Sequence, residues 1–176
     1  MADDWPRYID AAKRKIEIAE YHCDQLKHAL SNASVPHDWR PEIRTQACFE
    51  GVVVATIAAV DQIAQAVNSA LNLHLASGKL FEGTLGEILE RVPEYENWRQ
   101  QPIGRDLRRL RTRMVHYSYT KSSNGPRWEV EVANEDYAGP RDLLGYAEAT
   151  TAYAQELGSL AGKLETSLAA STKAGG

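Results

Sequence analysis

Residues 51–60 read GVVVATIAAV, an almost unbroken run of apolar and small side chains in the first half of the chain. The run lies inside a longer stretch, residues 41–75, whose apolar positions recur at the 3,4 spacing typical of an α-helix. A helix that is apolar nearly all round is buried on several sides. We therefore expect residues 41–75 to form the central helix of the fold.

Further helices are expected on both sides of this central one. Stripes of apolar residues at 3,4 spacing predict helices over residues 6–30, 102–117 and 140–168. The spacing of Thr84 and Glu87 is that of a capping box, which predicts a short helix starting at Thr84. The expected fold is all-α, an antiparallel four-helix bundle in a single domain over residues 1–168, with a disordered tail at 169–176.

One stretch before the last helix has a different pattern. Tyr117 and Tyr119 alternate with polar residues, SSNGP reads as a turn, and Trp128, Val130 and Val132 alternate again. Alternation on both sides of a turn is typical of two antiparallel strands. The sequence therefore predicts a small β-hairpin inserted before the last helix.

Composition places the chain among ordinary globular proteins. It has 176 residues, of which 43% are hydrophobic and 25% charged, enough for one domain with its own core. Cys23 and Cys48 fall inside helical patterns and are expected to be buried, reduced thiols. The N-terminus is too polar for a signal peptide, and the apolar run 51–60 is shorter than the roughly 18–20 residues of a membrane span. These features predict a soluble, cytoplasmic protein without a membrane partner.

A basic stretch stands out because the chain as a whole has a net charge of −4. Residues 105–113 read RDLRRLRTR, which is five arginines and one aspartate, a local charge of +4, and His116 follows three residues later. At 100° per residue, one stripe of the expected helix holds four polar residues: Arg105, Arg109, Thr112 and His116. The apolar stripe of the same helix lies roughly opposite. We expect the arginines and the histidine to point toward solvent or a partner.

Arginine and histidine together can cleave RNA without a metal. Arginine is always charged and binds phosphate through two hydrogen bonds, and histidine exchanges a proton near pH 7. The histidine can activate a 2′-hydroxyl while guanidinium groups stabilise the charge that develops on the phosphate. One histidine cannot easily act as both base and acid, so this chemistry calls for a two-fold dimer. No cofactor is expected, and no histidine pair or carboxylate cluster has convincing metal-ligand spacing.

The combination of an arginine and a histidine with four to six residues between them, on the third core helix of a four-helix bundle, resembles the HEPN superfamily. The segment from Arg111 to His116 matches the shorter spacing of the motif, and Arg109 to His116 matches the longer one. The resemblance extends over residues 41–168, although only the motif is specific. It implies a homodimer whose facing motifs form a composite ribonuclease site. HEPN proteins are often toxins, antiphage effectors or RNA-processing factors.

The resemblance assigns expected roles to individual residues. The catalytic candidates are Arg109, Arg111 and His116. The candidates for binding RNA phosphates are Arg105, Arg108, Thr112 and Arg113. The supporting candidates are Tyr117, Tyr119 and Asp61, which is expected to be a buried polar residue of the second helix. Thr112 follows the motif arginine directly, where family members usually carry Asn, Asp or His.

Two other interpretations stay open. HEPN-type domains that have lost catalysis serve as nucleotide-binding, RNA-binding or protein-interaction modules, and a toxin of this class would bind an antitoxin. Alternatively, the arginine run is a solvated helix face paired with acidic residues, as charge runs usually are. In that case the chain is a structural helical dimer with no role in RNA metabolism.

Overall fold

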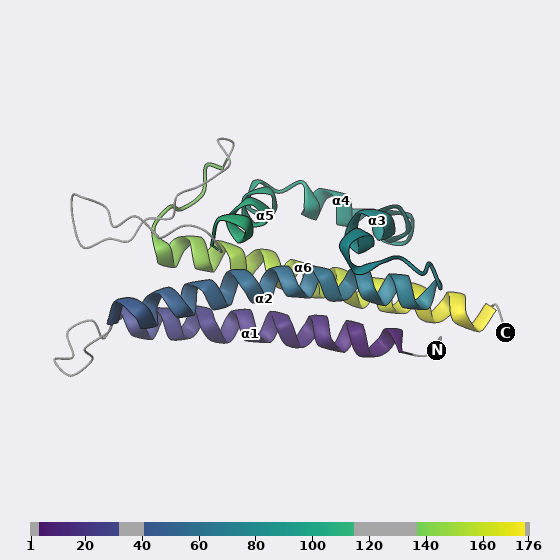
Figure 1. Ribbon diagram of the computed structural model, residues 1–176, viewed down its shortest axis with the longest axis horizontal. Coiled ribbons are helices and arrows are strands. Elements are labelled where there is room, and N and C mark those ends of the chain that lie inside the picture. The colour runs from purple at the N-terminus through teal and green to yellow at the C-terminus, as the bar shows by residue number, and fades with distance from the viewer. Residues whose placement is uncertain (1–3, 32–40, 115–136, 175–176) are drawn as a thin grey trace.

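A computed structural model describes residues 4–31, 41–114 and 137–174, with side chains described at 4–31, 43–110 and 137–171, and every element in it is a helix (Figure 1). Three helices are long: α1 (Trp5–Ser31), α2 (Pro41–Ala70) and α6 (Leu143–Ala174). Four shorter elements lie between α2 and α6 in the chain: η1 (Ser77–Lys79), α3 (Leu80–Arg91), α4 (Glu94–Arg99) and α5 (Pro102–Met114). The prediction of an all-α protein is confirmed for this part of the chain.

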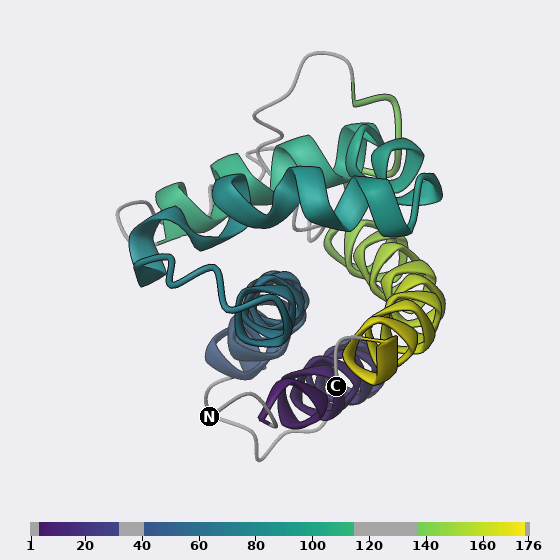
Figure 2. The ribbon, with the colours of Figure 1, turned by 90° about the vertical axis from the view of Figure 1, so that its right-hand side faces the viewer.

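The helices form two layers. The long helices α1, α2 and α6 lie side by side along the long axis of the molecule (Figure 1). Helices α3 and α5 are seen nearly end-on in Figure 1 and lengthwise in Figure 2, so they cross the long helices. The predicted antiparallel four-helix bundle is therefore not confirmed, because α5 does not run alongside the other three. The apolar stripe of α5, of which Ile103, Leu107 and Leu110 are buried, is short. It can be buried where α5 crosses the long helices, without the two running in parallel.

The 3,4 stripe predicted in the first helix is buried as expected. Its members lose nearly all of their exposed surface between α2 and α6: Ile9, Ala12, Ile16, Ala19, Cys23 and Leu26. The alanines in this stripe allow the helices to approach closely. Polar pairs border the contact, since Lys13 Nζ donates to Glu165 Oε2 at 2.5 Å. The side chain of Gln155 likewise donates to Glu20 at 2.8 Å.

The central helix is shorter than predicted. It ends at Ala70 instead of continuing to residue 75, because Asn72 and His74 adopt left-handed backbone conformations with φ of 51° and 53°. The side chain of Asn68 holds this turn. Its Oδ1 accepts a hydrogen bond from the Leu75 backbone N–H at 3.0 Å, and its Nδ2 donates to the Leu75 carbonyl at 3.4 Å.

The predicted capping box is wrong. Helix α3 begins at Leu80, four residues before Thr84, and Thr84 lies buried within the helix. Its hydroxyl donates to the Leu80 carbonyl at 2.6 Å. The Thr84 side chain therefore bonds to the preceding turn of its own helix and does not cap a helix N-terminus.

The last helix is shifted toward the C-terminus relative to the prediction. It begins at Leu143, where Asp142 accepts a hydrogen bond from the Gly145 backbone N–H at 2.9 Å and so acts as a cap. It continues to Ala174, through residues that were expected to belong to a disordered tail. Ser171 explains part of this extension, because it accepts a hydrogen bond from Arg91 of α3 at 2.7 Å. The predicted β-hairpin falls on residues 115–136, outside the described part of the chain.

The apolar character of α2 extends beyond residues 51–60. By length and composition alone, its residues Ile43–Ala70 could cross a membrane, and half of the apolar window in this helix is buried inside the protein. Helix α2 contacts α1, α3, α5 and α6. These contacts are those of a core helix in a globular protein.

Candidate functional site

Helix α5 has a buried face and a basic face. Ile103, Leu107 and Leu110 are buried, whereas Arg105, Arg108 and Arg109 are exposed. The prediction that Arg105 and Arg109 lie opposite the apolar stripe is therefore confirmed. These arginines also have interactions within their own chain, among them a hydrogen bond from Arg105 Nη2 to Gln100 Oε1 at 3.1 Å.

The other predicted site residues lie at or beyond the described end of α5. The backbone places Arg111, Thr112 and Arg113 in its last turn, while their side chains are outside the described part. His116, Tyr117 and Tyr119 fall outside the described residues altogether. The catalytic assignment of Arg111 and His116 is thus left as a prediction.

A buried carboxylate on α5 was not anticipated from the sequence. Asp106 has 0% of its surface exposed, and it accepts a hydrogen bond from the Tyr146 hydroxyl of α6 at 2.6 Å. Sequence reasoning counted Asp106 only as a negative charge in the arginine run. A signal was nevertheless present, because Asp106 follows Ile103 by three residues and precedes Leu110 by four, which places it on the apolar stripe.

The hydrogen bond between Asp106 and Tyr146 lies where several segments meet. The Tyr146 ring packs against Phe49 of α2 with centroids 5.8 Å apart, and against Tyr137 with centroids 5.4 Å apart. The Tyr137 hydroxyl donates to the Pro140 carbonyl at 3.2 Å. This one pair therefore ties the arginine helix to α6, and through the tyrosine rings to α2 and residues 137–140.

Electrostatics at this junction suppress ionisation of a tyrosine. Burial raises the pKa of Tyr137 to about 12, and the negative charges of Asp106 and Asp142 act in the same direction. Tyr137 is therefore a neutral hydrogen-bond donor throughout the physiological pH range.

A second contact fixes the start of α5. Gly104 lies against the hydroxyl of Tyr153 in α6, where the Cβ of any other residue would overlap that ring. Tyr153 stacks on Trp98 with ring centroids 4.2 Å apart, and Trp98 Nε1 donates to the Tyr153 carbonyl at 2.8 Å. Burial raises the pKa of Tyr153, and the positive charge of the nearby Arg108 opposes that shift. Helix α5 is thus held by two sets of contacts on the same neighbour, α6.

Asp61 does not join the arginine helix. It is exposed rather than buried, which corrects the expectation of a buried polar residue in α2. Asp61 follows the exposed Val54 by seven residues, so the two share the outward side of the helix. It lines a pocket of about 500 Å³ together with Gln65, Ser77, Gly78, Leu80, Phe81 and Glu82. Along α2, Asp61 lies twelve residues, about 18 Å, beyond Phe49. Phe49 packs on Tyr146, the hydrogen-bond donor to Asp106, so Asp61 is far along the helix from the Asp106 contact.

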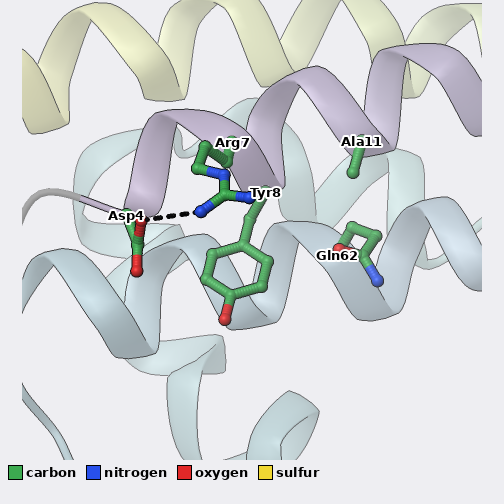
Figure 3. A pocket seen from close by; sticks show the side chains of 5 residues that line it. All are labelled: Asp4, Arg7, Tyr8, Ala11 and Gln62. Carbon is green, nitrogen blue, oxygen red and sulfur yellow. Dashed lines mark hydrogen bonds and ion pairs between the residues drawn. The ribbon is translucent and has the colours of Figure 1, made fainter. Parts of the chain in front are cut away.

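Another pocket lies between the first turns of α1 and the last third of α2 (Figure 3). It has a volume of about 310 Å³ and is lined by five residues: Asp4, Arg7, Tyr8, Ala11 and Gln62. Arg7 Nη1 and Asp4 Oδ1 form an ion pair at 3.2 Å at the α1 side of the pocket. None of the predicted site residues lines this pocket. Within the described ranges, no group of three or more His, Cys, Asp or Glu side chains could hold a metal ion.

The arrangement on α5 can bind anions. Three exposed guanidinium groups on one rigid face offer paired hydrogen-bond donors at a spacing set by the helix. Comparison of the chain with protein-family models, with curated proteins and with solved structures finds no match. The HEPN resemblance therefore rests on the motif at Arg109, Arg111 and His116.

Proposed function

We propose that the chain is a HEPN-like, metal-independent endoribonuclease of the cytoplasm that acts as a homodimer and binds RNA through α5. The observation that carries this proposal is the division of α5 into two faces. Its exposed face bears Arg105, Arg108 and Arg109, while its buried face is fixed to α6 through Asp106.

Recognition of phosphate follows from charge and geometry. Residues 105–113 carry a charge of +4 in a chain whose net charge is −4, so the attraction for a polyanion is confined to this helix. Guanidinium groups bind phosphate oxygens through two parallel hydrogen bonds. A helix held by buried contacts presents these groups without having to order a loop first, which lowers the entropic cost of binding.

Cleavage is assigned to the residues at the end of the arginine run. In this proposal His116 takes the proton from the 2′-hydroxyl, and the resulting oxygen attacks the adjacent phosphorus. Arg109 and Arg111 stabilise the negative charge that develops on the phosphate oxygens. His116 of the second copy donates a proton to the departing 5′-oxygen. The products are a 2′,3′-cyclic phosphate and a free 5′-hydroxyl.

The test is an RNA cleavage assay in the presence of EDTA that compares the unmodified protein with His116→Ala. We expect cleavage to persist in EDTA and to fall at least about 100-fold in the variant. His28→Ala is the matched control, because His28 is exposed on α1 and should leave the rate unchanged. Cleavage that needs a metal, or that survives His116→Ala, would contradict the proposal.

A catalytically inactive RNA-binding module is the second candidate. The described arginines of α5 favour it on their own, because their exposure does not depend on His116. This function predicts RNA binding that weakens as salt concentration rises, without cleavage of the RNA. A structural dimer without a role in RNA metabolism predicts neither activity, so one binding assay and one cleavage assay separate the three functions.

A further inference from the structure

We draw no further inference here: the strongest candidate, the pocket of about 500 Å³ between α2 and the start of α3, is lined by the exposed carboxylates of Asp61 and Glu82, and nothing in the described part of the chain indicates which ligand it would hold.

Discussion

Helices α2 and α5 are fixed to the same protein in different ways. Helix α2 buries apolar side chains over about two thirds of its length, from Cys48 to Val67, against four other helices. Among the residues of α5 whose side chains are described, Ile103, Leu107 and Leu110 are buried together with one carboxylate, Asp106, and the helix contacts three other helices instead of four. The amount of buried surface therefore positions α2, whereas a few specific contacts position α5.

The exposed sides of the two helices differ just as clearly. The exposed side of α2 includes the apolar side chains of Ile43 and Val54, which suit contact with another protein surface. The exposed side of α5 carries arginines, which suit a polyanion. Because much of its surface carries positive charge, α5 cannot also bury a wide apolar face. The hydrogen bond between Asp106 and Tyr146 therefore provides part of its attachment to the rest of the protein.

The largest loss of stability is expected in the core of α2. Phe49→Ala removes a ring with 0% of its surface exposed that packs on Tyr146, and should lower the free energy of unfolding by about 3–5 kcal/mol. Urea denaturation followed by circular dichroism measures this change. Val54→Ala on the exposed side of the same helix should cost less than about 0.5 kcal/mol. Equal losses at both positions would mean that burial does not distinguish the two sides of α2.

A smaller loss is expected at the anchor of α5. Tyr146→Phe keeps the ring and removes the hydroxyl that donates to Asp106, which leaves a buried carboxylate oxygen without that donor. We expect the free energy of unfolding to fall by about 1–3 kcal/mol. Tyr21→Phe, at an exposed tyrosine, is the control and should be neutral. If Tyr146→Phe is neutral as well, apolar contacts alone hold α5, and its contrast with α2 disappears.

The same junction predicts a dependence of stability on pH. The pKa of Tyr137 is raised to about 12 in the folded protein, against an ordinary value of 10. A raised pKa means that the unfolded chain loses this proton first, so stability is fully present below pH 10 and falls as pH rises toward 12. Tyr137→Phe should reduce this fall, measured as the slope of the melting temperature against pH between 10 and 12. An unchanged slope would show that Tyr137 does not contribute to it.

Periodicity in the sequence predicted which side of a helix is buried and failed to predict how helices cross. The stripe of Ile9, Ile16 and Cys23 in α1 and the exposed Arg105 and Arg109 in α5 follow directly from the 3.6-residue repeat. The crossing of α5 over the long helices could not be predicted in this way. Crossing angles depend on which side chains meet across the contact, and a single stripe does not contain that information.

Polar residues were the harder part of the prediction. Asp61 was expected to be buried because apolar residues surround it in the sequence, yet its position is in line with the exposed Val54. Asp106 was overlooked because the arginines around it suggested a solvated charge. In both cases the angular position on the helix was more informative than the neighbouring residues. The hydrogen bonds of Asn68, by contrast, involve a turn whose geometry no sequence spacing indicates.

The smallest effect on stability, and the sharpest test of α5, is expected for Arg109→Ala. Arg109 is exposed, so its replacement should change the free energy of unfolding by less than about 0.5 kcal/mol. RNA affinity should nevertheless fall, and the slope of log affinity against log salt should decrease by about 0.7 for single-stranded RNA if one phosphate contact is lost. Fluorescence anisotropy at several salt concentrations measures both quantities.

Arg14→Ala is the control for this comparison, because Arg14 is an exposed arginine on α1, away from the basic helix. Removing Arg14 changes the net charge of the protein as much as removing Arg109 does. If RNA responds only to net charge, the two variants lose affinity equally and α5 has no special role. If only Arg109→Ala lowers the affinity and the salt slope, phosphates bind at the arginine face of α5, and the helix that is anchored through the buried Asp106 is the one that binds RNA.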